Sequence, residues 1–258
     1  LIIKNATAVT MDATSTVTVD GSVDIGHGGA GGIAGSITGD IVLTNIILDA
    51  NGDGDGAGNP AKLLVKSTTG NITLAGTIDL NADPDVVDQK NDIVIIAEGG
   101  SIINGSGSAI AIDEVNNLTL TAKGSIGSLA KPLTVNAKTI SLTSTSVTAG
   151  DADIYINNNP NVLNLDSSDT VTLATIDTGI EGKITYRQTG QKLKITGPIK
   201  SYGGDILIDP PTDLLINETI NGGGGSVTAE ANGNITFGAN GYIVTKGTGN
   251  ILVQADMD

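Results

Sequence analysis

The chain has 258 residues, of which 36 are glycine, 2% are aromatic and none is cysteine, and its formal net charge is −15. The acidic balance excludes the cationic surface that nucleic-acid backbones and anionic lipids require, and the lack of cysteine excludes disulfides, thiolate nucleophiles and cysteine-based zinc sites. A hydrophobic content of 39% with a mean hydropathy of +0.14 is enough to build a core, so we expect the chain to fold.

Glycine, threonine, asparagine and isoleucine are spread evenly along the sequence, and no linker rich in proline or serine interrupts them. We therefore expect residues 1–258 to form one continuous unit. The longest apolar runs, such as residues 93–97, are far shorter than the roughly 20 residues needed to span a bilayer. The chain begins at Leu1 without a signal segment and stops after a strand-like run, so we expect it to be part of a longer chain.

Short strand-like units recur along the chain, and helical spacing is nearly absent. Each unit has a small or turn-forming residue, a polar residue, and then aliphatic residues at alternating positions. Alternate residues of a strand point to opposite faces, so each unit has one apolar face, which so short a strand cannot bury alone. The units are residues 39–43, 70–74, 117–120, 138–142, 153–156, 182–186, 204–208, 233–237 and 249–253.

Stacking of these units in register would bury their apolar faces in a continuous column, so the sequence predicts an all-β parallel β-helix, or β-solenoid. With about 22 residues per coil, the chain would make about 11–12 coils and a rod roughly 55 Å long. The scarcity of aromatic residues fits a narrow aliphatic interior. The alternative is one or more antiparallel β-sandwiches, which the scarcity of Asn-Gly and Asp-Gly hairpin turns disfavours.

Residues 124–135 read GSIGSLAKPLTV and follow the strand-like segment 118–123, LTLTAK. This stretch resembles the G-x-I-G-x-x-x-x-P-L motif, preceded by an L-x-L-x-A strand, in the repeat regions of filamentous haemagglutinin-like bacterial exoproteins. The resemblance implies a right-handed parallel β-helix in a secreted, often cell-surface protein used for adhesion or as an extended stalk. It carries over no functional residue, because such repeat regions supply a scaffold.

One acidic loop has the first half of a calcium-binding pattern, D-x-N-x-D-G. Position 12 of the loop is Pro60 instead of a bidentate glutamate, so calcium binding competes with the interpretation as a solvated loop. The cluster of Asp83, Asp85 and Asp88 is a weaker candidate, and no other cofactor is expected. The candidate calcium ligands are Asp49, Asn51, Asp53 and Asp55.

Three further features have simpler interpretations. His27 lies in a glycine-rich stretch without a partner serine or cysteine in a recognisable motif, so we expect a loop residue. The glycine runs 28–32 and 222–225 lack the lysine of a phosphate loop and are expected to be turns. The array of Thr14, Thr16 and Thr18 does not recur at a coil period, so we expect no hydroxyl ladder from it.

A polysaccharide-cleaving β-helix would need clustered carboxylates near a basic group. Arg187, the single arginine, is distant in sequence from the candidate carboxylates, and the five aromatic residues are dispersed. We expect no catalytic residue and interpret the chain as a structural or adhesive segment of a secreted bacterial surface protein or extracellular filament. A polysaccharide lyase or glycoside hydrolase is the alternative, with candidates Asp151, Asp153, Asp166 and Asp169.

The ends and outer faces of a solenoid are its natural contact surfaces. An end exposes unpaired backbone groups and apolar side chains, and neither end of the sequence has the amphipathic pattern of a capping helix. We therefore expect the ends to contact further coils, from the same chain or from stacked copies in a filament. A cell-surface or glycan receptor is the expected partner of the outer faces.

Overall fold

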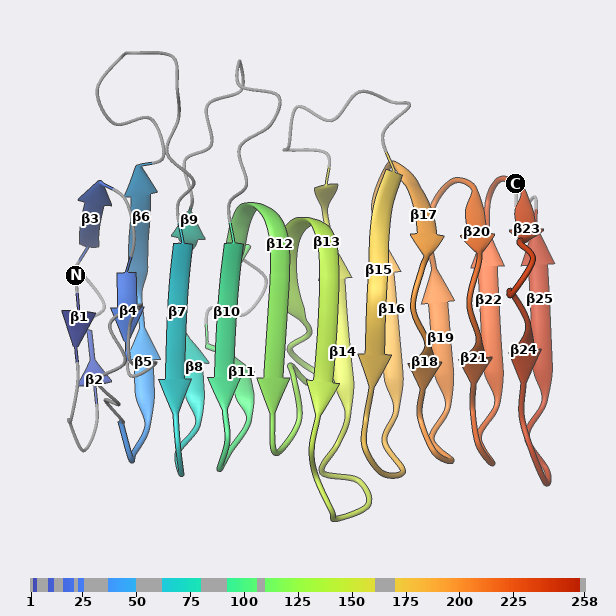
Figure 1. The fold of residues 1–258 in the computed structure, drawn as a ribbon, viewed down its shortest axis with the longest axis horizontal. Helices are drawn as coiled ribbons and strands as arrows, with labels where there is room; N and C mark the ends of the chain where they lie inside the picture. The colour runs from blue at the N-terminus through green and yellow to red at the C-terminus, as the bar shows by residue number, and fades with distance from the viewer. Residues whose placement is uncertain are drawn as a thin grey trace.

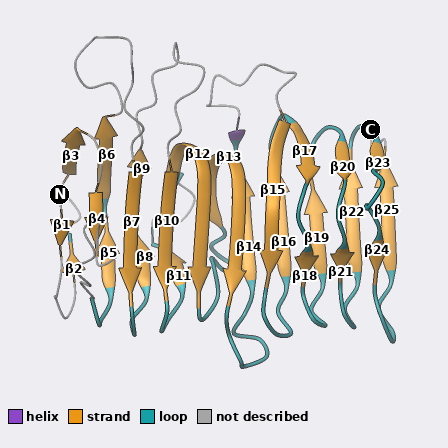
Figure 2. Cartoon of the chain, in the orientation of Figure 1, coloured by secondary structure: helices purple, strands orange, loops and turns teal. Residues whose placement is uncertain are grey.

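A computed structural model describes residues 2–3, 9–11, 16–20, 23–25, 37–49, 62–79, 92–105, 110–160 and 170–255. The regular elements of this part of the chain are β-strands, and all their pairings are parallel. The strands stack side by side along the long axis (Figure 1), and turns join them at the edges of the stack (Figure 2). The expected all-β fold is confirmed for these residues, their parallel stacking is consistent with a solenoid-like fold, and parallel pairing excludes the antiparallel sandwich for them.

One set of strands, which we call the back column, contains one short strand per coil, except where the single residue Ile126 bridges β11 and β14. The Gly-polar-aliphatic units predicted from the sequence begin most of these strands. The strands are β2 (Val9–Thr10), β5 (Ile41–Leu43), β8 (Ile72–Leu74), β11 (Ile102–Asn104), β14 (Ile154–Asn158), β16 (Ile184–Gln188), β19 (Ile206–Asp209), β22 (Val227–Ala231) and β25 (Ile251–Ala255).

A second set, the front column, contains longer strands in its middle part and two short strands per coil after β15, because β15 pairs with both β17 and β18. Its strands are β1 (Ile2–Ile3), β4 (Val23–Ile25), β7 (Lys62–Ser67), β10 (Asp92–Ala97), β12 (Ile112–Ala122), β13 (Leu133–Ser144), β15 (Thr170–Asp177), β17 (Lys192–Ile195), β18 (Ile199–Lys200), β20 (Leu214–Ile216), β21 (Ile220–Asn221), β23 (Ile235–Phe237) and β24 (Ile243–Val244).

A third, shorter column closes the first coils and contains β3 (Thr16–Asp20), β6 (Asn45–Asp49) and β9 (Ile78–Asp79). It continues into the beginning of β12, where Ile112 pairs with Ile78. In β3, the register places Thr16 opposite Asn45 and Thr18 opposite Ile47, so no threonine lies opposite them in β6; Thr14 lies outside the described residues.

The described residues contain ten levels in the back column, where a level is one coil, against the 11–12 expected. Val9 and Ile251 are 242 positions apart in sequence and are joined by nine steps, so a level takes about 27 residues. The expected value was too small because the early coils are long: Ile41 and Ile72 are 31 residues apart, whereas Ile206 and Val227 are 21 apart. At about 4.8 Å per level, the ten levels extend roughly 43 Å.

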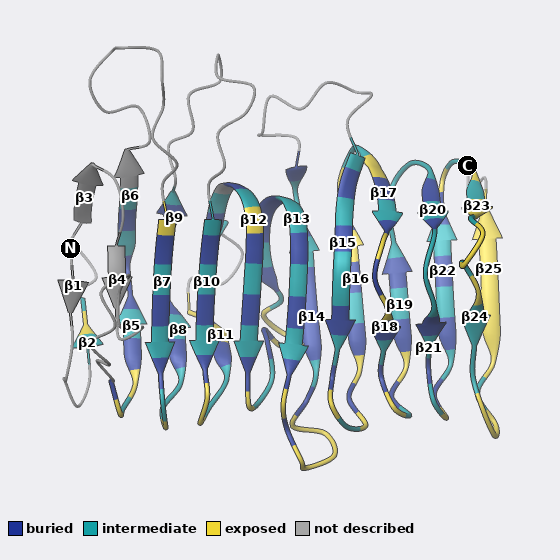
Figure 3. Ribbon diagram, viewed as in Figure 1, coloured by how far each residue is buried: buried dark blue, intermediate teal, exposed yellow. Residues whose placement is uncertain are grey.

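Alternate residues of each strand face the interior, as the period of a β-strand requires. In β7, Leu63 and Val65 are fully buried between outward-facing neighbours, and the same alternation recurs along the stack (Figure 3). Among the described residues, the buried hydrophobic cluster is aliphatic except for Tyr186. Tyr186 has no exposed surface and occupies the position held by Ile156 and Ile208 at the neighbouring levels, so the interior accepts one ring.

Glycine is found two residues before the aliphatic residue that starts each back-column level from Ile41 to Ile251, with Ala152 as the exception. A Cβ on Gly100 would lie 2.6 Å from the carbonyl oxygen of Gly70 on the previous level, and one on Gly182 would lie 2.7 Å from that of Ala152. The turns of these coils therefore stack backbone against backbone, and this close approach leaves no room for a side chain at Gly100 or Gly182.

Candidate functional site

The polar residue of each repeated unit connects one coil to the next. Asp40 Oδ1 accepts a hydrogen bond from the backbone N–H of Asn71 at 2.7 Å, and Asn71 Oδ1 accepts one from the N–H of Ser101 at 2.8 Å. The same bond joins Ser101 to Ser125, Asp153 to Lys183, Asp205 to Ser226, and Ser226 to Asn250. We call this series the turn ladder, and it consists of residues 40, 71, 101, 125, 153, 183, 205, 226 and 250.

The chemistry of the ladder explains one of its interruptions. Lys183 donates its backbone N–H to Asp153, but its ammonium group has no lone pair to accept a bond from the next level. The series starts again at Asp205, which accepts from the N–H of Ser226 at 2.9 Å. Aspartate, asparagine and serine are therefore interchangeable at this position because each has an oxygen acceptor.

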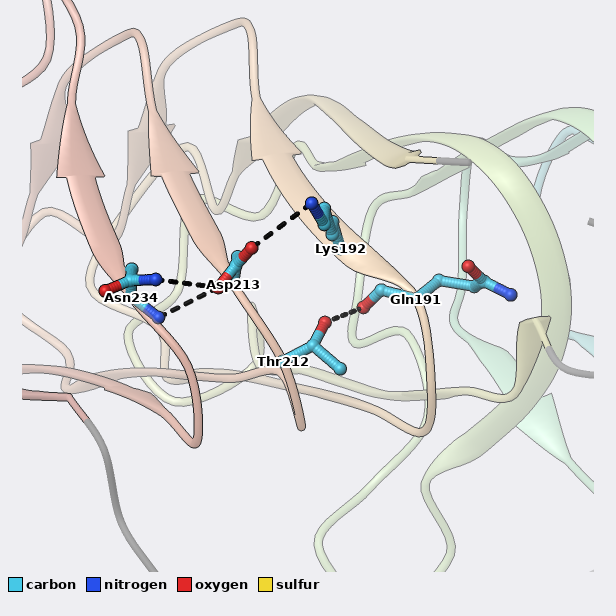
Figure 4. Close-up of polar contacts among 5 residues, drawn as sticks. All are labelled: Gln191, Lys192, Thr212, Asp213 and Asn234. Carbon is cyan, nitrogen blue, oxygen red and sulfur yellow. Dashed lines mark hydrogen bonds and ion pairs between the residues drawn. The ribbon is translucent and has the colours of Figure 1, made fainter. Parts of the chain in front are cut away.

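A second polar row joins the front-column turns before β17, β20 and β23. Asp213 Oδ1 accepts the backbone N–H of Asn234 at 2.9 Å, and its Oδ2 lies 3.3 Å from Lys192 Nζ (Figure 4). The backbone hydrogen bond from Asn234, together with the contact to Lys192, lowers the pKa of Asp213 below its ordinary value. Thr212 donates to the carbonyl oxygen of Gln191 at 2.5 Å, so the polar row and the adjacent backbone both tie successive turns together.

Two of the four carboxylates proposed for polysaccharide cleavage, Asp151 and Asp153, lie in the described residues and line different surface hollows. Asp153 Oδ1 is bonded to the N–H of Lys183, and its Oδ2 accepts the Tyr155 hydroxyl at 3.1 Å. Burial, with a smaller contribution from the charge of Asp153, raises the pKa of Tyr155 to about 12. Asp151 lies beside Lys123 in a different hollow from that of Asp153, and each of these hollows contains a single carboxylate. Asp166 and Asp169 lie outside the described residues.

The motif at residues 124–133 builds a projecting turn between two levels. Gly127 has a φ of +66°, and a Cβ there would lie 2.5 Å from the carbonyl oxygen of Tyr155. Ser128 and Lys131 exchange backbone hydrogen bonds of 3.0 and 3.1 Å, which close the turn and leave Leu129 75% exposed. Position 127 therefore requires glycine for two reasons, the left-handed conformation of its backbone and its close contact with the next coil.

A surface hollow of about 610 Å³ adjoins this turn, and three neighbouring levels line it. Thr134 pairs with Asn157, and Asn157 pairs with Arg187, so the segments lie directly beside one another. Three asparagines and one glutamine are among the residues that line it, and we call it the amide hollow. Its lining consists of residues 130–132, Thr134, residues 157–159 and residues 187–189.

The amide hollow has a rigid inner wall. The Asn158 amide exchanges hydrogen bonds of 3.0 Å with the backbone N–H and carbonyl of Ala137 and donates to the Tyr186 hydroxyl at 3.1 Å. Tyr186 in turn donates to Gln188 Oε1 at 2.7 Å, and Gln188 Nε2 donates to two backbone carbonyls. Burial raises the pKa of Tyr186 above its ordinary value, so this phenol stays protonated and bonded at neutral pH.

Sequence reasoning singled out Arg187 and, within the motif at residues 124–135, residues 130–132 and Thr134, but it missed residues 157–159, Gln188 and Thr189. Arg187 Nε lies 3.4 Å from Asp209 Oδ2, and the guanidinium shares the hollow with Lys131 from the projecting turn. The run of three asparagines at 157–159 was the available signal. Lys131 and Arg187 are 56 residues apart, and only the register of the coils brings their segments together.

The other candidates fall largely outside the described residues. Asn51, Asp53 and Asp55 are not described, and Asp49 is described only as the last backbone position of β6, so calcium binding stays a prediction. His27 and residues 83–88 also lie outside that part of the chain. Within the described ranges, no group of three or more His, Cys, Asp or Glu is placed to hold a metal ion. The turn expected at 222–225 is confirmed, with Gly223 at a φ of +62°.

Comparison with protein-family models, with curated proteins and with solved structures finds no match to this chain. In the segments that the structure describes, no helix has the length and apolar character needed to cross a membrane.

Proposed function

We propose that the chain is a non-catalytic, adhesive segment of a secreted bacterial surface protein or extracellular filament, built as a right-handed parallel β-helix. The turn ladder carries the proposal. Its polar side chains, Asp153 among them, bond to the backbone of the next coil, so groups that an enzyme would present to substrate serve the stack instead. The right hand is that of nearly all parallel crossovers. Export follows from the resemblance of residues 124–135 to filamentous haemagglutinin-like exoproteins.

The ends of the stack provide the second part of the proposal, which is association with further coils. β25 is the last described strand of the back column, and Ile251 and Val253 are 48% and 42% exposed. They continue inward columns in which Val227 and Ala229 are fully buried, and β25 is exposed along its whole length (Figure 3). Among the described strands, β25 pairs with β22 on one side only, and an apolar strand with one such edge is a template for a further parallel coil, supplied by the same polypeptide or by a second copy.

Adhesion and catalysis are separated by one pair of experiments on the purified chain. Beads coated with the chain should be retained on cell monolayers or on a glycan array, and a panel of polysaccharides incubated with it should keep its length. Asp151→Asn combined with Asp153→Asn serves as the control, because it should leave retention unchanged. Shortening of a polysaccharide that this double variant abolishes would overturn the proposal in favour of the enzyme. Absence of retention on every surface would overturn the adhesive assignment.

A further inference from the structure

The amide hollow concentrates positive charge on a strongly acidic chain. Lys131 and Arg187 both line it, and none of its lining residues is acidic, although the whole chain has a formal net charge of −15. The contact that Arg187 makes with Asp209 is through Nε, at 3.4 Å, and the exposed guanidinium has two further amino groups that can donate. The hollow therefore offers two cationic groups to a ligand that carries negative charge.

The remaining lining groups suit a ligand with many hydroxyls. Asn157, Asn159 and the hydroxyls of Thr134 and Thr189 both donate and accept hydrogen bonds, as does each hydroxyl of a sugar. A bare phosphate has mainly acceptor oxygens and would leave the amide oxygens without donors. Neutral amides and hydroxyls next to two cations thus fit a polyhydroxylated ligand with an acidic group.

The hollow is also held in shape before any ligand binds. Thr189 donates to Asn159 Oδ1 at 2.7 Å, and the buried amides of Asn158 and Gln188 are fixed by the Tyr186 hydroxyl and by backbone groups. The three levels around it are in continuous parallel register. A preformed site loses less conformational entropy on binding, which favours even a small ligand.

We propose that the amide hollow binds a saccharide that carries a carboxylate, such as a uronic-acid unit of a surface glycan. This inference rests on the proposed adhesive function and names the chemistry of its receptor. The carboxylate lies between Lys131 and the terminal amino groups of Arg187, and the sugar hydroxyls bond to Asn157, Asn159 and Thr134. The volume of about 610 Å³ accommodates one or two sugar units.

The test is a calorimetric titration of the 258-residue chain with digalacturonate, and with the neutral disaccharide galactobiose as the reference. Digalacturonate should bind more tightly than galactobiose, and added salt should weaken its binding because the attraction is electrostatic. Arg187→Gln and Lys131→Gln should each lower the affinity at least fivefold. Lys62→Gln removes an exposed lysine far along the stack and should have no effect.

A matched variant separates the ligand contact from the ion pair. Asp209→Asn breaks the same pair as Arg187→Gln but keeps the guanidinium, so its affinity for digalacturonate should stay the same or rise. Three results would each overturn the inference. Galactobiose could bind as tightly as digalacturonate, Asp209→Asn could lose as much affinity for digalacturonate as Arg187→Gln, or digalacturonate could fail to bind in the millimolar range. Equal binding of a tetraglutamate peptide would overturn the saccharide assignment. Thermal melting checks that each variant is folded.

The two proposals fail in distinguishable ways. If coated beads are retained on cells while digalacturonate does not bind, the amide hollow is not the receptor site and the adhesive function stands. If digalacturonate binds and is shortened by the wild-type chain, the non-catalytic function is overturned while the assignment of the hollow remains.

Discussion

Gly100 lies directly against Gly70 of the preceding coil, so that a Cβ on Gly100 would be 2.6 Å from the Gly70 carbonyl oxygen. Gly100→Ala should therefore push two turns apart and lower the free energy of unfolding by about 1–3 kcal/mol. Gly224→Ala is the matched control, because its new Cβ would meet nothing closer than 3.9 Å, and we expect a change within about 0.5 kcal/mol. Denaturant unfolding of both variants measures the difference, and equal stability would contradict backbone stacking.

Asp213 should make the stability of the chain sensitive to acid. Its pKa is lowered in the folded state, so its stabilising contribution is complete above its ordinary pKa and disappears as the pH falls through the lowered value. The side chain is 38% exposed, and solvent screening limits the contribution to about 0.2–1 kcal/mol. Asp213→Asn keeps an oxygen acceptor for the N–H of Asn234 but removes the charge.

The wild-type chain should be more stable than Asp213→Asn near neutral pH, and the two should melt together in strong acid. Lys192→Gln should produce a smaller loss at neutral pH, because the backbone hydrogen bond from Asn234 remains. Melting temperatures across the acid range provide the measurement. A difference between wild type and Asp213→Asn that is independent of pH would show that the charge is not responsible.

Tyr186→Phe should destabilise the middle of the stack. The loss of the hydroxyl leaves Gln188 Oε1 and an Asn158 N–H unpaired in the interior, at a cost of about 1–3 kcal/mol. Because burial raises the pKa of Tyr186, its contribution is complete below the ordinary tyrosine pKa and is lost at higher pH, as the unfolded chain ionises. Tyr242→Phe, at a 55% exposed position, should change neither stability nor its alkaline dependence.

Association through the end of the stack should depend on the inward column of β25. Val253→Lys places a charge where Ala229 is buried on the previous level, and we expect it to abolish self-association. Leu252→Lys alters a neighbouring residue with a similar exposure, 47%, on the opposite face of the strand and should leave association intact. Sedimentation velocity over a range of concentrations compares them. A wild-type chain that stays monomeric throughout would contradict stacking of copies.

Calcium should raise the melting temperature if Asp49, Asn51, Asp53 and Asp55 bind it, because a ligand that binds only the folded chain stabilises it. Asp53→Asn combined with Asp55→Asn should remove the increase. Magnesium at the same concentration is the control for a nonspecific effect of divalent charge. No difference between calcium and chelator in the wild-type chain would eliminate this site.

The sequence pattern predicted where strands occur better than it predicted whether each strand belongs to the back column or the front column. The units at 39–43, 70–74 and 204–208 begin back-column strands, as expected. Those at 117–120 and 233–237 are in the front column, so the spacing between successive units mixed two sides of the coil. The levels that begin at Ile102, Ile126 and Val227, each preceded by a serine in the turn, were not among the predicted units. Units taken from two sides made the coil seem shorter than it is, and the omitted levels offset only part of that error.

The amide hollow shows why a site in a solenoid is hard to predict from sequence. Its residues are separated by one coil each, and the lengths of those coils differ: Ile126 and Ile154 are 28 residues apart, and Ile154 and Ile184 are 30 apart. Without the register, Lys131 and Arg187 have no recognisable relation. The glycine and polar positions were easier to predict because the same backbone contact selects them at every level.

The turn ladder determines which changes of length the chain can tolerate. Gly204 and Gly225 occupy equivalent positions, so deletion of residues 204–224 would seat Gly225 on Gly182 and leave every inward column in phase. Deletion of one residue more would turn the following strand over and expose its aliphatic face. The molecule can therefore be shortened or extended by whole coils, because each coil contacts only its two neighbours. The length of the stack can change in this way while the packing of the remaining interior stays the same.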